Sequence, residues 1–106
     1  NRLFGEATRR ARADEVEALI RVYWYTLEFG VIGRPGEYRV IGAGLLSSFG
    51  ELGRFEHETE KRPFDLATIA ATPFDPTDYQ RVLFVAENID EVLTKLTSWL
   101  GRFASR

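Results

Sequence analysis

Glu28 is the residue with the clearest chemical signal, because it is a carboxylate inside the apolar and aromatic stretch Tyr23–Gly30 (YWYTLEFG). The spacing of the apolar residues before it predicts a helix from about Asp14 to Gly30, which puts Glu28 in the last turn. A negative charge there opposes the helix dipole, at a cost of about 0.3–1 kcal/mol when exposed. Partial burial adds a desolvation cost unless a cation or a donor compensates it. Glu28 is therefore a candidate functional residue, although a structural ion pair with an arginine would explain it equally well.

Other residue types that carry chemistry are scarce. There is no cysteine, which excludes disulfides, thiolate metal sites and cysteine nucleophiles. The single histidine, His57, stands among glutamates in a polar stretch typical of a surface residue. The segment Gly42-Ala43-Gly44 lacks the basic residue of a phosphate loop, but its small side chains let another backbone or a ligand approach closely. The net charge of -2 comes from interspersed charges, so we expect neither a nucleic acid nor a membrane partner.

The elements that position Glu28 follow from periodicity and turn residues. Residues 5–13 are polar and could extend or precede the helix, and Asp14 with Glu17 predicts its capped start. A type II turn is predicted at Arg34–Glu37 (RPGE), between short strands at Phe29–Ile32 and Glu37–Ile41.

The second half of the chain predicts three more helices and a strand. Ser48–Glu51 (SFGE) is a capping box that predicts a helix to about residue 58, and a short helix is predicted at Asp65–Ala71. The apolar run Val82–Ala86 predicts a buried strand, and Asn88 with Glu91 predicts the capped start of a last amphipathic helix. The predicted fold class is α+β, with helix predominant.

Three stretches, in order and in register, resemble the pterin-dependent aromatic amino acid hydroxylases, a family that comprises the phenylalanine, tyrosine and tryptophan hydroxylases. They are Tyr23–Gly30, Gly42–Leu52 (GAGLLSSFGEL) and Val82–Glu87 (VLFVAE). The resemblance covers roughly residues 14–100 and is to the C-terminal part of the catalytic domain. It implies one Fe(II) held by two histidines and one glutamate, with a tetrahydropterin as electron donor for the hydroxylation of an aromatic ring by oxygen.

The resemblance also implies residue roles. Glu28 falls on the glutamate that binds the iron, which makes it both the metal-binding and the catalytic residue. Tyr23 and Trp24 match residues packed around the metal and the pterin, and are the implied cofactor-binding residues.

A second group of implied roles lies in the Gly42–Leu52 stretch. Gly44, Ser47 and Ser48 match the segment that lines the amino acid pocket, and Ser47 also matches a residue that supports an iron-binding histidine. Glu51 matches an acid that orders the same loop. Helix capping is the simpler explanation for Ser48 and Glu51, as a backbone bend is for Gly44.

The two iron-binding histidines of the family lie in an H-x-x-x-x-H segment upstream of the glutamate helix, and this chain has no such segment. His57 lies downstream and matches no ligand position. The chain also contains no methionine. We therefore expect residues 1–106 to be a single partial domain of a larger cytoplasmic enzyme, inactive by itself and without tightly bound iron or pterin.

Phenylalanine is the expected amino acid substrate, with molecular oxygen, because the bacterial phenylalanine hydroxylases are the commonest short members of the family. The alternative is a non-catalytic small α+β module on the same scaffold that binds an amino acid or a protein partner. A purely structural domain is a third possibility, and it predicts that Glu28 lies beside an arginine with no open cleft. An H-x-x-x-x-H segment a few dozen residues upstream would favour the enzyme.

Overall fold

Helices and a small sheet make up the chain in a computed structural model that describes residues 2–43, 59–76 and 81–104. The helices are α1 (Arg2–Arg10), α2 (Ala13–Tyr23), the π-helical turn η1 (Trp24–Glu28), α5 (Leu66–Ala70) and α6 (Ile89–Ala104). The strands are β1 (Val31–Ile32), β2 (Arg39–Val40), β3 (Glu60–Pro63) and β4 (Val82–Ala86). This confirms the predicted α+β class with helix predominant.

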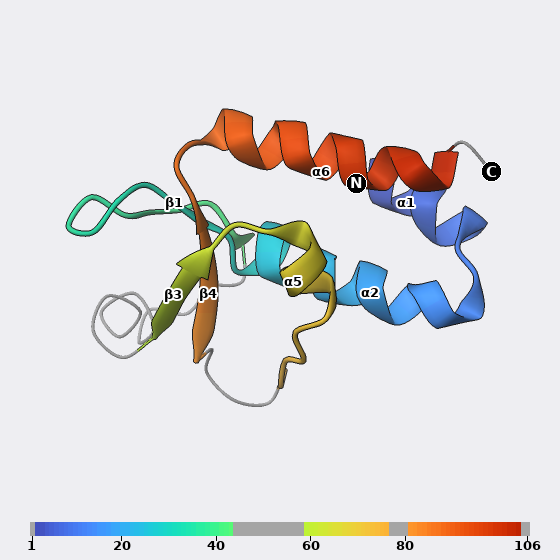
Figure 1. Cartoon of the computed structure of the whole chain (residues 1–106), viewed down its shortest axis with the longest axis horizontal. Coiled ribbons are helices and arrows are strands. Elements are labelled where there is room, and N and C mark those ends of the chain that lie inside the picture. Colours follow the sequence, from blue (N-terminus) through green and yellow to red (C-terminus); the bar gives the residue numbers. More distant parts are fainter. Residues whose placement is uncertain (1, 44–58, 77–80, 105–106) are drawn as a thin grey trace.

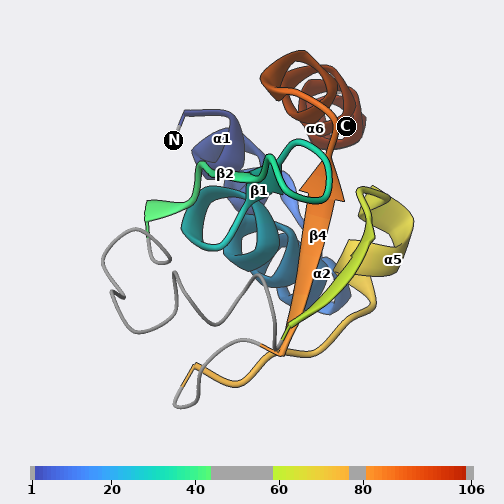
Figure 2. The same ribbon diagram turned by 90° about the vertical axis from the view of Figure 1, so that its left-hand side faces the viewer.

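Within the described ranges, the strands form one sheet in the order β2-β1-β4-β3. β1 and β2 are an antiparallel hairpin, whereas β1 and β3 both run parallel to β4. Figure 2 shows β4 standing between the hairpin and β3. Because β4 is paired on both sides, its apolar residues are shielded, and Leu83, Phe84 and Ala86 are buried.

The hydrophobic core lies where the helices meet β4. Figure 1 shows α6 along one side of the molecule, α1 beneath its C-terminal half, and α2 continuing into η1 on the opposite side. Phe84 of β4 has no exposed surface, and it meets Leu19 and Val22 of α2, Ile69 of α5 and Leu96 of α6 in a single cluster. The helix that carries Glu28 is therefore anchored along its buried face. No helix in the described part of the chain is long and apolar enough to cross a membrane.

The start of α2 corrects one prediction. Its first residue is Ala13, and Glu15 accepts a hydrogen bond from the amide of Arg12 at 2.8 Å. Glu17 instead forms an ion pair with Arg21, one turn along, at 2.6 Å. The predicted capping pair of Asp14 with Glu17 is therefore wrong, because the acid three residues after Arg12 satisfies the free amide.

The hairpin and its turn agree with prediction, although the strands are shorter. Gly36 has a φ of 84°, and the amide of Glu37 donates to the carbonyl of Arg34 at 2.8 Å, as a type II turn requires. The short helix and the buried strand also lie where they were predicted, as α5 and β4. The helix predicted from Ser48 lies outside the described residues.

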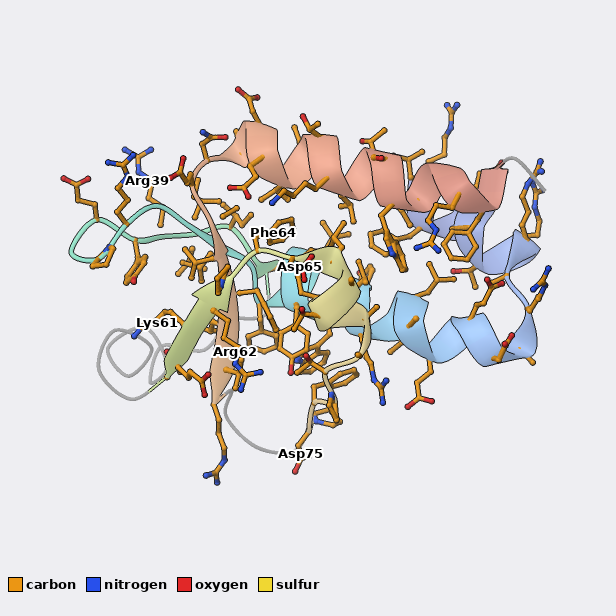
Figure 3. The ribbon with its side chains drawn as sticks, viewed as in Figure 1. Arg39, Lys61, Arg62, Phe64, Asp65 and Asp75 are labelled. Atoms are coloured by element: carbon orange, nitrogen blue, oxygen red, sulfur yellow. The ribbon has the colours of Figure 1, made fainter. Side chains whose placement is uncertain are left out.

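The edge strand β3 was not predicted. Its residues Glu60, Lys61 and Arg62 are charged, and Pro63 is tolerated only because the strand lies at the edge of the sheet. Figure 3 shows Lys61 and Arg62 on opposite sides of β3. The Lys61 ammonium lies 5.7 Å from the centre of the Tyr38 ring, and Arg62 pairs with Glu60 at 2.5 Å.

Asn88 caps α6, as the sequence predicted, since its Oδ1 accepts the amide of Glu91 at 2.9 Å. We expect Asn88→Ala to lower the free energy of unfolding by about 1 kcal/mol, because that amide loses its partner. Asn88→Asp keeps an acceptor oxygen and should cost little. Urea denaturation of the two variants measures the difference, and an equal loss in both would contradict the cap.

Candidate active site

The helix that carries Glu28 changes its pitch just before this residue. In the turn η1 the amide of Phe29 donates to the carbonyl of Trp24, five residues back, at 2.9 Å. Such π-helical turns are rare and are frequent at functional sites. Thr26 is buried within the turn and donates its hydroxyl to the carbonyl of Val22 at 2.7 Å, a type of bond that bends helices. The predicted helix therefore has the expected extent, but its last turn is wider than an α-helical one.

Two glycines bring the hairpin against the backbone at Glu28. The amides of Ile41 and Gly42 donate to the carbonyl of Gly30 at 2.9 and 3.1 Å. A Cβ atom at Gly42 would overlap the carbonyl group of Glu28, and one at Gly30 would overlap the carbonyl oxygen of Thr26. The predicted close backbone approach at Gly42 is confirmed, and it holds the end of η1 in place.

Aromatic contacts tie a distant loop to the same turn. The ring of Trp24 stacks on that of Phe74 with centroids 4.4 Å apart and contacts Phe29 at 4.8 Å. The neighbouring Tyr25 points into the core and donates its hydroxyl to the carbonyl of Pro73 at 2.7 Å. The sequence analysis did not predict these contacts, and its only signal was an aromatic residue set between prolines.

Tyr25 is the one residue of η1 with a perturbed titration. Burial raises the pKa of its hydroxyl above the ordinary value near 10, and the charges of Arg62 and Arg21 offset part of this effect. Its neutral, hydrogen-bonded form is therefore the one that the fold favours.

Glu28 itself is half-buried at the C-terminal end of η1. Within the described part of the chain, no hydrogen bond or ion pair joins its carboxylate to another residue. This does not support the structural alternative, in which an arginine neutralises it. A half-buried anionic oxygen donor at the negative end of a helix fits a divalent cation as its partner. In residues 2–43, 59–76 and 81–104, however, no three acidic or histidine side chains come together to hold a metal.

The other candidate residues have different surroundings. Tyr23 directly precedes η1, and its ring meets that of Phe4 edge-on at 5.3 Å. Trp24 is half-buried in the aromatic cluster described above. The remaining candidates, as well as His57, lie outside the described residues: Gly44, Ser47, Ser48 and Glu51. Their implied roles stay predictions.

Comparison with known proteins decides the family. The family model for biopterin-dependent aromatic amino acid hydroxylases matches residues 3–105. This chain belongs to that family. Tyrosine 3-monooxygenase of Rattus norvegicus is 42% identical over 99 residues, which cover 92% of this chain and 20% of that protein. Phenylalanine-4-hydroxylase of Caenorhabditis elegans is also 42% identical, over 96 residues, which cover 90% of this chain and 21% of that protein. The chain thus spans about a fifth of the length of these curated relatives.

Solved structures of the family have the same fold. Phenylalanine hydroxylase from Legionella pneumophila superposes with a TM-score of 0.82 at 25% identity, over 98% of this chain and 42% of that one. The iron- and phenylalanine-bound enzyme from Chromobacterium violaceum gives 0.80 at 30% identity, over 92% and 38%. A further structure of the Chromobacterium enzyme, with iron(III) and 7,8-dihydrobiopterin bound, gives 0.76 at 31% identity, over 92% and 36%. The predicted family and fold are confirmed.

The contact at Gly42 predicts a strong effect of one added methyl group. We expect Gly42→Ala to lower the free energy of unfolding by about 1–3 kcal/mol, because the Cβ atom forces the hairpin away from Glu28. Gly101→Ala is the matched control, since Gly101 lies in α6 with no atom within 4 Å of the added carbon. The control should be stabilising by about 0.5–1 kcal/mol. Urea denaturation compares the two, and a harmless Gly42→Ala would contradict the proposed backbone contact.

The buried hydroxyl of Tyr25 predicts a pH-dependent contribution to stability. Tyr25→Phe should cost about 1 kcal/mol at pH 8, because the carbonyl of Pro73 loses its donor. Since the pKa of Tyr25 is raised in the folded chain, its contribution is present below the unfolded value near 10 and is lost as the pH rises above it. The difference between wild type and variant, measured by denaturation from pH 8 to 11, should therefore shrink. A difference that stays constant over this range would refute the assignment.

Proposed function

We propose that this chain is the C-terminal part of the catalytic domain of an iron- and tetrahydropterin-dependent monooxygenase, and that Glu28 is its carboxylate ligand to Fe(II). One observation carries the proposal. Glu28 is a half-buried carboxylate at the end of a π-helical turn, without a partner among the described residues, in a chain that belongs to the aromatic amino acid hydroxylases. The bound iron and the reduced pterin would supply the activation of oxygen for ring hydroxylation.

In this proposal each nearby residue has a physical task. Glu28 contributes an oxygen donor and one negative charge. The glycine contacts behind η1 hold the backbone of Glu28 in place, so that little conformational freedom is lost when the metal binds. Trp24 and its aromatic neighbours shield one side of the turn from water. Tyr23 and Trp24 are the proposed residues beside the metal and pterin.

The remaining proposed roles concern the loop after β2. Gly44, Ser47 and Ser48 are proposed to line the amino acid pocket. Ser47 would also support an iron-binding histidine, and Glu51 would order the loop. The support for these roles is the Gly42–Leu52 stretch, which resembles the family at these positions.

Two imidazole ligands are needed beside Glu28, and the chain contains one histidine. We therefore propose that residues 1–106 are a single partial domain and that both imidazoles come from polypeptide outside them. The coverage supports this proposal, since the chain spans 36–42% of the solved relatives described above. A cytoplasmic location is part of the proposal and is compatible with the absence of cysteine.

Phenylalanine is the proposed substrate. Its support is that the bacterial relatives with TM-scores of 0.76–0.82 are phenylalanine hydroxylases, one of them with phenylalanine bound. Tyrosine 3-monooxygenase and phenylalanine-4-hydroxylase are equally similar in sequence, at 42% identity each. An activity assay that offers both amino acids therefore decides the specificity.

The metal-ligand role predicts that Glu28→Ala, in the longer protein that contains this chain, abolishes stoichiometric iron and lowers turnover of phenylalanine more than about 100-fold, since even supporting residues cost 10–100-fold. The fold should be retained, because the side chain makes no other contact of this kind among the described residues. Glu37→Ala is the control, an exposed carboxylate in the hairpin. Iron analysis, circular dichroism and product formation measure the three effects. Normal iron content in Glu28→Ala would exclude the assignment.

A further inference from the structure

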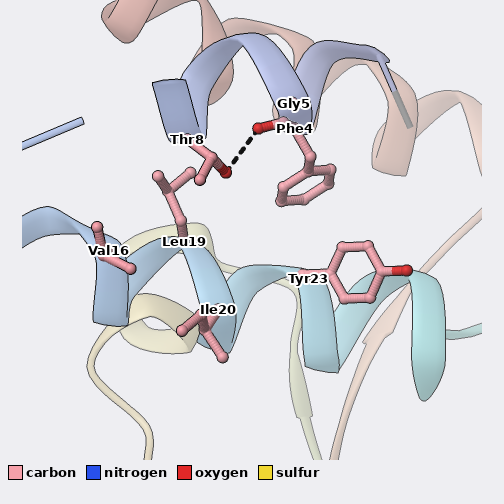
Figure 4. Close-up of a pocket in the computed structure, with 7 residues that line it drawn as sticks. All are labelled: Phe4, Gly5, Thr8, Val16, Leu19, Ile20 and Tyr23. Carbon is pink, nitrogen blue, oxygen red and sulfur yellow. Dashed lines mark hydrogen bonds between the residues drawn. The ribbon is translucent and has the colours of Figure 1, made fainter. Parts of the chain in front are cut away.

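An apolar groove runs between α1 and α2, on the helix that leads into η1. Figure 4 shows Phe4 and Thr8 of α1 on one side of it and Val16, Ile20 and Tyr23 of α2 on the other. Its volume is about 260 Å³. The groove is open to solvent, because 50% of Ile20 and 38% of Tyr23 are exposed. Large apolar side chains that gather in an open hollow mark an interaction surface more often than chance exposure does.

The chemistry of the groove selects its occupant. None of the residues that line it carries a charge, and the hydroxyl of Thr8 is already used in a hydrogen bond to the carbonyl of Phe4 at 2.8 Å. A free amino acid or a pterin would lose water at its polar groups and gain few partners in return. The volume is also below the roughly 300–1,000 Å³ of most ligand pockets. Apolar side chains of a protein segment meet these conditions.

The length of the relatives indicates which protein segment this is. The superposition covers nearly all of this chain but 42% of the Legionella enzyme and 38% of the Chromobacterium enzyme, so most of each of those chains has no counterpart in these residues. On the proposed function, the missing part has to bring two imidazoles to Glu28. Tyr23, at one end of the groove, directly precedes Trp24–Glu28. A segment seated in the groove would therefore end beside the metal-ligand turn.

We propose that this α1–α2 groove is the docking surface for the part of the catalytic domain that lies outside residues 1–106, and that apolar side chains of that part fill it. The inference rests on the proposed function. It adds a structural reason for the dependence of the iron site on the longer protein, since the same contact that covers Ile20 and Tyr23 positions the missing ligands.

The test compares two variants in two proteins, the 106-residue chain and the longer protein encoded by its gene. Ile20→Asp puts a charge in the groove, and Leu93→Asp puts one on α6, where Leu93 is 54% exposed and lies outside the groove. We expect Ile20→Asp to lower the melting temperature of the longer protein by about 5–10 °C, because an unpaired charge becomes buried. The same change should shift the 106-residue chain by less than about 2 °C, and Leu93→Asp should shift neither protein.

Covalent surface labelling of the two wild-type proteins gives a second measurement that needs no variant. Ile20 and Tyr23 should be labelled in the 106-residue chain and protected in the longer protein, whereas Leu93 should be labelled in both. Equal labelling of the groove in the two proteins would overturn the inference. A 106-residue chain that dimerises through the groove, and that Ile20→Asp converts to a monomer, would also overturn it in favour of a second copy.

Iron analysis of the longer protein separates this inference from the proposed function. A protected groove without iron bound through Glu28 leaves the docking surface intact and rejects the metal assignment. Iron that depends on Glu28, together with a fully labelled groove, has the opposite meaning.

Discussion

Backbone contacts that only glycine permits hold the end of η1 in place, and the geometry of the candidate site depends on them. Gly42 lies against the carbonyl group of Glu28, and Gly30 accepts hydrogen bonds from the neighbouring hairpin strand. The hairpin is in turn tied to the centre of the sheet, because Val31 of β1 pairs with Val85 of β4. The position of Glu28 is thus set by the sheet as well as by its own helix. A carboxylate ligand needs this kind of support, because a metal site loses affinity when its donors have to be ordered on binding.

Electrostatics and packing at this turn favour the same interpretation. The helix end repels the charge of Glu28, and partial burial removes water from it, yet the described residues offer it no donor. The surrounding aromatic residues are held tightly, by the stack of Trp24 on Phe74 and the hydrogen bond from Tyr25 to Pro73. A rigid surrounding with one uncompensated anion is what a cation site requires before its cation is bound.

Sequence patterns predicted the elements whose burial is periodic, and they did not predict the features that depend on distant partners. The helices α2 and α6 and the strand β4 follow from their apolar spacing, since each buries one face or both in a single core. β3 is a charged edge strand whose pairing with β4 leaves no mark in its own sequence. The widened turn and the stack on Phe74 arise where segments about 50 residues apart meet. Glu28 was identified because its charge conflicts with its local environment, whereas its metal-ligand role came from the family resemblance.

The groove between α1 and α2 and the carboxylate of Glu28 describe one situation, in which a folded part of a domain presents the surfaces that its remainder would complete. The most direct test of the central claim is a crystal structure of the longer protein loaded with iron, with the metal located by its anomalous scattering. The account predicts that a carboxylate oxygen of Glu28 is bonded to the iron beside two imidazole nitrogens from outside this chain. An iron site without Glu28, with this side chain paired to an arginine or turned to solvent, would contradict it.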